Sequence, residues 1–379
     1  MAVTRREFIL GAVASLVIPK TVLAGSKVFK SAGIGVNCFD LFYGTLVDER
    51  GVRSARDRLW ELSDAGIPFV RFAASPFWPK EWSLYPKERY YRLLDEVFLN
   101  AEKFGIGLVP SLFWSPTSVS DLFGESITSW GFSASKTSKF ARRYVQDIIG
   151  RYGKYNSVLH WEFGNEFNLN LDYFNRDFPW PKVNVAMGTP ERRIPTDVLS
   201  TDDYARLMTN FASWVQEIKP STLISSGSDI PRFDAFNLQQ GKSSADTVEQ
   251  FRQAVCNANP VKNSIASIHF YPDKIRKYSK WDATASKLLI EAKAAAASND
   301  QHLFVGEFGV RAQGNPKEEY ATFDMMLNAL DIAGIESAAL WVYDFGKWQP
   351  DWSVTLSNAR SWQLKNVLEF NNRRAKQAS

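Results

Sequence analysis

The feature that most constrains the fold is a repeated alternation of short apolar runs with longer amphipathic stretches, which begins after residue 30. The apolar runs cover 34–38, 69–73, 107–113, 158–163, 223–226, 264–270, 303–308 and 337–342. Helices are expected over 54–65, 87–104, 135–152, 201–218, 244–257, 280–297, 316–333 and 360–371. Because each expected strand is apolar along its whole length, the strands belong in a parallel sheet that helices cover.

Eight strand–helix units over about 340 residues predict a closed (β/α)8 barrel, an α/β fold of one domain over 25–379, rather than an open doubly wound sheet. Glycines at 66, 105 and 334 follow expected helices, where a C-cap belongs. The Gly33–Gly35 segment lies within the first strand and lacks the third glycine of a dinucleotide-binding loop. Nucleotide binding is therefore not expected.

Residues 1–24 are typical of an export signal. A basic start that contains Arg5 and Arg6 precedes Phe8 and a modest apolar run over 11–18. The paired arginines resemble the twin-arginine signal, which the twin-arginine export machinery reads; an ordinary amphipathic N-terminus is the alternative. The run is shorter than the ~20 residues that span a bilayer. We therefore expect a periplasmic or secreted protein whose mature form has no stable membrane association.

Charge and cysteine content exclude several classes of protein. Lys and Arg number 45 against 41 Asp and Glu, and this small, dispersed excess does not predict nucleic-acid binding. Two cysteines, Cys38 and Cys256, exclude a disulfide scaffold, and the three histidines show no ligand spacing. Because twin-arginine substrates fold before export, among reduced thiols, both cysteines are expected to stay free. No metal or organic cofactor is expected.

Two carboxylates come at the ends of expected strands. The fourth strand runs into Glu166 and the seventh into Glu307, 141 residues later. In a closed barrel the C-terminal strand ends carry the reactive groups, so these side chains should face each other across one mouth. Paired carboxylates suit glycoside hydrolysis, in which one protonates the leaving oxygen and the other attacks or stabilises the anomeric carbon.

Further polar residues end the neighbouring strands. Arg71, near the end of the second strand, would keep Glu307 ionised if it lies beneath that carboxylate, although a structural ion pair is the alternative. Tyr271 is expected to donate to Glu307, and His269 to line the same wall unless it is a packed core histidine. Asn165 would bond the 2-hydroxyl of a sugar. Glu162, buried by pattern, is expected to be structural.

The stretch Trp161-Glu162-x-x-Asn165-Glu166, with His269-x-Tyr271 and Gly306-Glu307-Phe308-Gly309, resembles clan A glycoside hydrolases and especially family 5. The resemblance covers nearly the whole mature chain by strand order and implies a retaining enzyme on a (β/α)8 barrel. It implies that Glu166 is the acid/base, Glu307 the nucleophile and Asn165 the 2-hydroxyl partner. Arg71, His269 and Tyr271 would support the nucleophile and the sugar beside it, and Trp341 would lie under that sugar. One departure is that the family's histidine near the end of strand three is missing, because that region reads Ser111-Leu112-Phe113-Trp114-Ser115.

Aromatic residues make up 14% of the chain, and many of them fall in expected loops after strands. Such rings can stack on sugar faces, although packing between long loops is the alternative. The loop aromatics are Phe77, Trp78, Trp82, Trp114, Trp130, Phe132, Tyr173, Phe174, Trp180, Trp348 and Trp352. We single out Trp78 and Trp114 as substrate-binding residues. The longest connection, roughly 168–199, is also expected to be functional.

The sequence therefore predicts a retaining, endo-acting β-glycoside hydrolase. Several stacking positions in a row suit a β-linked polysaccharide as the substrate, and β-1,4-glucan or β-mannan follows from the resemblance alone. An exo-acting β-glycosidase with a closed pocket is one alternative. A carbohydrate-binding barrel without catalysis is another, from a different class of protein.

Overall fold

The computed structural model describes residues 32–173, 181–194, 197–275, 278 and 280–378. The predicted export signal, residues 1–24, lies outside this part of the chain, as do Phe174 and Trp180. No helix within the described ranges is long and apolar enough to cross a membrane.

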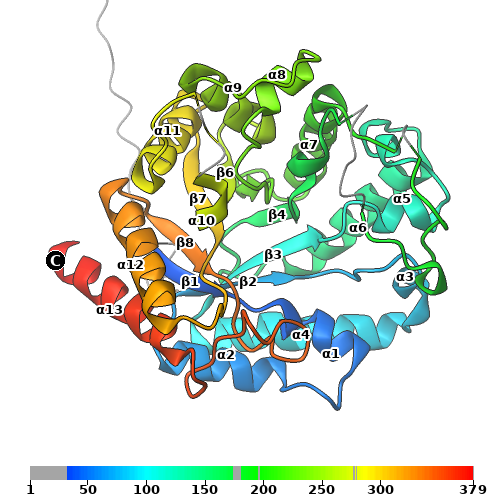
Figure 1. Cartoon of the computed structure of the whole chain (residues 1–379). Coiled ribbons are helices and arrows are strands. Elements are labelled where there is room, and N and C mark those ends of the chain that lie inside the picture. Colours follow the sequence, from blue (N-terminus) through cyan, green and yellow to red (C-terminus); the bar gives the residue numbers. More distant parts are fainter. Residues whose placement is uncertain (1–31, 174–180, 195–196, 276–277, 279, 379) are drawn as a thin grey trace, which may run out of the picture.

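The strands form a closed parallel barrel, as predicted (Figure 1). Each strand pairs with the next in the sequence, and the last pairs with the first to close the ring. The strands are β1 (Gly33–Asn37), β2 (Phe69–Ala73), β3 (Gly107–Phe113), β4 (Trp161–Gly164), β5 (Ile224–Ser225), β6 (Ile265–Phe270), β7 (His302–Phe308) and β8 (Ser337–Leu340). Four strands, β4, β5, β6 and β8, are shorter than the apolar runs that predicted them. Val158 makes only an isolated bridge to Leu108, and β8 ends at Leu340.

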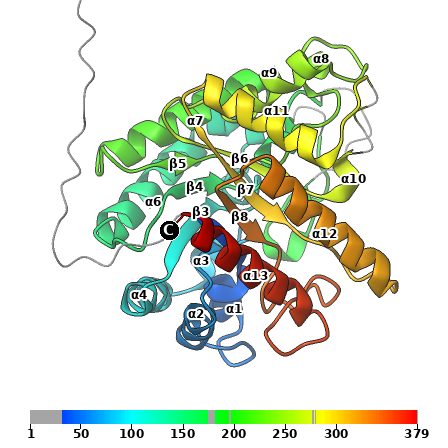
Figure 2. The ribbon, with the colours of Figure 1, turned by 90° about the vertical axis from the view of Figure 1, so that its left-hand side faces the viewer.

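Within the described residues, eight long helices surround the barrel, and the turned view in Figure 2 also places them outside the strands. They are α2 (Ala55–Asp64), α4 (Lys87–Phe104), α6 (Lys136–Tyr152), α7 (Thr201–Gln216), α9 (Val248–Ala258), α11 (Ala285–Ser298), α12 (Pro316–Ile332) and α13 (Ser361–Ala378). Each matches a predicted helix. The C-cap of α4 is Gly105, whose φ of 74° lies in the left-handed region that glycine adopts at little cost.

Short helices that the periodicity did not predict follow several strands. They are α1 (Tyr43–Val47), α3 (Glu81–Leu84), α5 (Ser118–Leu122), α8 (Ala235–Gln239) and α10 (Pro272–Ile275). With four or five residues each, they are too short to show a helical period in the sequence. They enlarge the connections at the C-terminal ends of the strands, where they shape the mouth of the barrel.

The inside of the barrel changes character along its axis. Near the N-terminal ends of the strands, Phe69, Val109, Phe304 and Ala339 form an apolar layer. Two residues further along β2, Arg71 is fully buried in a polar network. Both cysteines are free, as expected, and burial raises the pKa of Cys38 to about 12.

Candidate active site

Glu307 lies near the end of β7, at the mouth of the barrel, and its side chain is 6% exposed. Arg71 Nη1 donates to Glu307 Oε1 at 2.8 Å, and the Tyr271 hydroxyl donates to Oε2 at 2.8 Å. Burial raises the pKa of Glu307, while the nearby His269 and Arg71 and the Tyr271 hydrogen bond act to lower it. The predicted contacts of Arg71 and Tyr271 with this carboxylate are therefore present.

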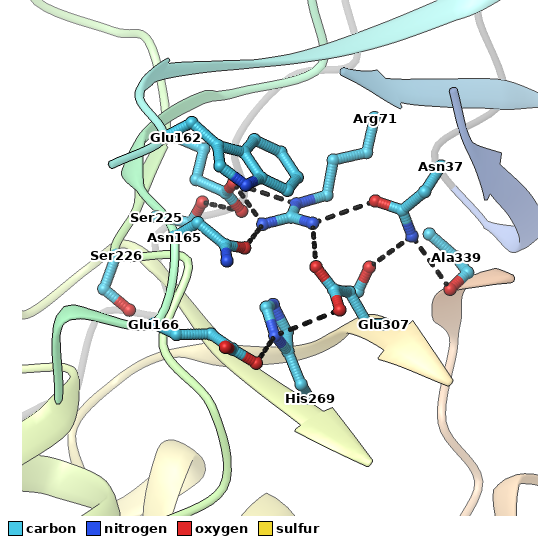
Figure 3. A network of polar contacts seen from close by, with 12 residues as sticks. Asn37, Arg71, Glu162, Asn165, Glu166, Ser225, Ser226, His269, Glu307 and Ala339 are labelled. Carbon is cyan, nitrogen blue, oxygen red and sulfur yellow. Dashed lines mark hydrogen bonds and ion pairs between the residues drawn. The ribbon is translucent and has the colours of Figure 1, made fainter. Parts of the chain in front are cut away.

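Arg71 is the centre of the polar network, as Figure 3 shows. Its Nε donates to Glu162 Oε1 at 2.8 Å, its Nη1 also reaches Asn37 Oδ1 at 2.9 Å, and its Nη2 donates to Asn165 Oδ1 at 2.8 Å. Burial alone would lower the pKa of Arg71, but Glu162 and Glu307 outweigh it and raise that pKa. Four side chains therefore hold the Arg71 guanidinium in place beneath the mouth of the barrel.

Glu166 follows β4 in a strained backbone conformation. Its φ of 55° lies in the left-handed region, which costs a non-glycine residue roughly 1 kcal/mol. Its backbone N–H donates to Gly227 O at 2.8 Å, which ties the turn to the segment after β5. Strained residues that their surroundings hold in place cluster at functional sites. The side chain is 30% exposed, five times the fraction for Glu307, so solvent reaches it.

His269 connects the two carboxylates. The imidazole is fully buried, and its Nδ1 lies 2.9 Å from Glu166 Oε1 and 3.6 Å from Glu307 Oε2. These two distances place the carboxylate oxygens no more than 6.5 Å apart, on either side of the ring (Figure 3). Burial lowers the pKa of His269, although the neighbouring Glu307 acts to raise it. The predicted meeting of Glu166 and Glu307 is thus found in the fold.

Two polar residues of the site were missed from the sequence. Asn37 ends β1 and donates to Gly306 O at 2.9 Å and Ala339 O at 3.2 Å, which bridges β7 and β8 beneath Glu307. The strand-end rule that found Arg71 would also have found it. Asp229 is fully buried after β5, and both its backbone N–H and its carbonyl bond the side chain of Asn168.

The side chains of Glu166, Asp229 and His269 each bring one donor atom within 4.8 Å of the others. An ion could be held at such a spacing. Two of the three residues, however, are Glu166 and His269, which already contact each other. The cluster is therefore part of the polar network around the carboxylate pair.

Aromatic side chains surround one side of the carboxylate pair. A cavity of about 620 Å³ is lined by Phe39, Tyr43, Phe77, Trp78, Trp114, Asn165, Glu166, Lys182, Glu307, Trp341, Phe345, Trp348, Gln349 and Trp352. Trp114 lies near-parallel to Trp341, with 6.0 Å between the ring centroids, and its ring stands 4.7 Å from the Arg71 guanidinium. We call this cavity the aromatic cavity. The three predicted stacking residues Trp78, Trp114 and Trp341 all line it.

The other side of Glu166 opens into a larger cavity of about 800 Å³, which we call the polar cavity. Its lining residues are Glu166, Tyr271, Pro272, Asp273, Gly309, Val310, Arg311, Gln313, Glu318, Glu319, Ala321, Thr322 and Trp352. Glu166 and Trp352 line both cavities, so they stand where the two meet. The site is therefore one long cleft with an aromatic half and a polar half.

Not all of the loop aromatics reach this cleft. Trp82 packs against the main core, and Trp130 is fully buried, where its Nε1 donates to Pro116 O at 2.8 Å. For these two rings the packing alternative is correct. Phe132 is exposed and lies near Arg206. The long connection after β4 does contribute, because its Lys182 lines the aromatic cavity and its Met187 carbonyl accepts from Lys80 N at 3.0 Å.

The sequence of the chain matches a known family over most of its length. A model of the family described as cellulase (glycosyl hydrolase family 5) matches residues 46–344. No curated protein matches the chain.

Solved structures of similar fold include two endo-mannanases and an endoglucanase. An endo-1,4-β-mannanase from Rhizomucor miehei has a TM-score of 0.65 at 14% identity, over 94% of this chain and 97% of its own. An endo-1,4-β-D-mannanase from Thermotoga petrophila has a TM-score of 0.62 at 13% identity, over 90% and 99%. An endoglucanase from Thermotoga maritima has a TM-score of 0.55 at 16% identity, over 89% and 96%. At these identities the likeness concerns the fold.

Proposed function

Since the chain belongs to glycosyl hydrolase family 5 and is a glycoside hydrolase, we propose that it is a retaining enzyme that cleaves a β-linked polysaccharide at internal bonds. Glu307 acts as the nucleophile and Glu166 as the acid/base. The observation that carries this proposal is the shared contact of both carboxylates with His269 Nδ1.

The spacing of the carboxylates favours the retaining mechanism. Retaining enzymes keep the two carboxyl groups about 5–5.5 Å apart, whereas inverting enzymes need about 6.5–9.5 Å to hold a water molecule between them. The upper bound of 6.5 Å between the oxygens that face His269 leaves little room for such a water. Glu307 is then close enough to attack the anomeric carbon while Glu166 protonates the leaving oxygen.

The surroundings of the two carboxylates suit different roles. Arg71 and Tyr271 bond both oxygens of Glu307, which orients the carboxylate and counters the effect of its burial. Glu166 is more exposed, so water can reach it in the second step, when it acts as a base on the glycosyl-enzyme. Asn165 Oδ1 accepts a hydrogen bond from Arg71 Nη2. The amide nitrogen of Asn165 is then the group that donates to the sugar 2-hydroxyl.

The long cleft supports internal cleavage. Sugars before the scissile bond would lie in the aromatic cavity beside Glu307, and sugars after it in the polar cavity beside Glu166. β-1,4-Glucan and β-mannan are the substrates that we propose to test first, because the similar folds above include enzymes named for such activities. Product sizing on β-glucan, β-mannan and β-xylan checks this, and release of single sugars from the start would favour an exo-acting enzyme.

Replacing Glu307 by Gln tests the nucleophile directly. We expect kcat to fall by on the order of 10⁴-fold or more, because no covalent intermediate can form. The urea midpoint of unfolding should stay close to that of the wild type. NMR of the first product should show the β-anomer in the wild type. An α-anomer, or unchanged kcat in the variant, would contradict the proposal, and binding of glycans without any hydrolysis would favour a carbohydrate-binding barrel.

Export by the twin-arginine route to the periplasm or beyond is also proposed, and it rests on residues 1–24 alone. Replacing Arg5 and Arg6 by Lys should retain the protein in the cytoplasm if the pair is read as a signal. Cell fractionation with an activity assay measures this.

A further inference from the structure

One wall of the aromatic cavity is built from two separate connections. Tyr43 belongs to α1, after β1, and Phe77 and Trp78 follow β2. The Phe77 ring is edge-on to Trp78, with centroids 5.0 Å apart, and tilted against Tyr43, with centroids 6.3 Å apart. Because none of the three lies in a strand, no sheet hydrogen bond fixes this wall.

Glu81, the first residue of α3, is hydrogen-bonded to both connections. It is 4% exposed and does not line the cavity. Its Oε2 accepts from the backbone N–H groups of Phe77 at 3.0 Å and Trp78 at 2.9 Å, and its Oε1 accepts from the Tyr43 hydroxyl at 3.1 Å. Burial raises the pKa of Glu81, and these hydrogen bonds act to lower it. One buried carboxyl group therefore satisfies three donors in the two segments that carry the wall.

We propose that Glu81 is a positioning residue that holds Tyr43, Phe77 and Trp78 in place for sugars beyond the one that Glu307 attacks. This inference rests on the proposed function, because the proposed function places those sugars in the aromatic cavity. Stacking depends on ring orientation, and a wall fixed before the substrate arrives avoids the entropy cost of ordering it during binding. The wall is then specific for β-glycans with at least two sugars before the scissile bond.

The test compares aryl β-glycosides that carry one, two or three sugars before the aryl group. In the wild type, kcat/KM should rise with each sugar that reaches the wall. Glu81→Leu removes all three acceptor contacts at similar volume, so we expect about a tenfold loss of kcat/KM on the trioside, mainly through KM. Turnover of the monoside should stay within about twofold of wild type. Equal losses on all three substrates would overturn the proposal.

Glu81→Gln is the conservative variant that should restore the preference. The amide oxygen can accept from Phe77 and Trp78, and the amide nitrogen can donate to the Tyr43 oxygen. If Glu81→Leu fails to fold, Tyr43→Phe gives a second route, because it keeps the ring and removes only the contact with Oε1. A smaller loss confined to the longer substrates is expected from it, and no change in the chain-length dependence would count against the proposal.

Glu125 provides a matched control. It accepts from the backbone N–H groups of Lys136 and Thr137 and from the Thr137 hydroxyl, the same set of donors as Glu81, but it is not among the residues that line the cleft. Glu125→Leu should lower the unfolding temperature without changing the trioside-to-monoside ratio. Trp78→Ala should lower that ratio, and combining it with Glu81→Leu should add little, since both act on one wall.

The outcomes separate this inference from the proposed function. A wild-type protein that hydrolyses none of the aryl β-glycosides and none of the polysaccharides would refute the proposed function. A wild-type protein that hydrolyses them with no gain from the second and third sugar would refute only the role of Glu81.

Discussion

The interior of the barrel is polar at the C-terminal ends of the strands and apolar at their N-terminal ends. Around the C-terminal strand ends, a buried arginine, its carboxylates and two asparagines form a continuous hydrogen-bonded network. Around the N-terminal ends, phenylalanine, valine and alanine form an apolar layer beside a cavity of about 220 Å³. The same strands β2 and β7 supply both, with Phe69 below Arg71 and Phe304 below Glu307.

The two buried histidines make the difference plain. His269, at the C-terminal end of β6, lies between Glu166 and Glu307. His160, just before β4, lines the N-terminal cavity with its ring edge-on to Phe304. The surroundings rather than the residue type decide what a buried histidine can do. The polar network with both glutamates lies at one end of the barrel, and the apolar layer lies at the other.

The largest effect on stability is expected from Arg71→Met. Glu162 and Glu307 would lose their buried cation, and removing one partner of a buried ion pair costs about 3–5 kcal/mol. Activity should be lost as well, because Glu307 would no longer be oriented. Urea denaturation and turnover measure the two effects. A variant with the wild-type free energy of unfolding would show that the Arg71 network does not stabilise this end of the barrel.

A smaller, pH-dependent effect is expected at His160. Burial lowers the pKa of His160 to about 4, against 6.5 for the ordinary side chain. The unfolded chain therefore binds the proton more tightly, so stability is complete above pH 6.5 and falls as the pH drops from 6.5 towards 4. The loss from this one group is on the order of 3 kcal/mol at pH 4.

His160→Leu should remove that part of the pH dependence. Urea unfolding at pH 7 and pH 4.5 provides the measurement, with His302→Leu, an exposed histidine that lines the same cavity, as the control. An unchanged difference between the two pH values would mean that His160 is not the titrating group.

The smallest effect is expected from Phe304→Leu in the apolar layer. The smaller side chain leaves part of the ring volume unfilled, and the change should cost about 1 kcal/mol in the free energy of unfolding. Because Phe304 lies below the network, kcat on a polysaccharide should remain within about twofold of wild type. A loss of activity as large as that of Arg71→Met would show that the two ends are not independent.

The strand-end rule explains why so much of the site could be predicted. In a parallel barrel the sequence position of a strand end fixes its place at the mouth, so Arg71, Glu166 and Glu307 were found without any contact information. Asn37 obeys the same rule, but the sequence hides it, because the apolar run continues one residue past the end of β1, to Cys38. Glu81 and Asp229 lie in connections, whose course no periodicity specifies.

The loop aromatics show the limit of the same reasoning. Trp78 and Trp82 are four residues apart, yet Trp78 lines the aromatic cavity and Trp82 packs against the core. Nothing in the local sequence separates them. Trp82 packs edge-on against Phe140 and Tyr144 of α6, whereas Trp78 contacts Phe77 in the cavity wall.

By itself, the sequence determined the barrel and the order of its strands, because hydrophobic periodicity is a local property that each segment carries with it. The ends of those strands then placed Glu166 and Glu307 at one mouth. Only the tertiary structure decided that His269 would connect the glutamates, that Arg71 would be held from four sides, and that one buried carboxyl group would tie two connections into a wall. Hydrogen bonds and ion pairs act over a few ångströms, so they depend on which distant segments the closed barrel brings together.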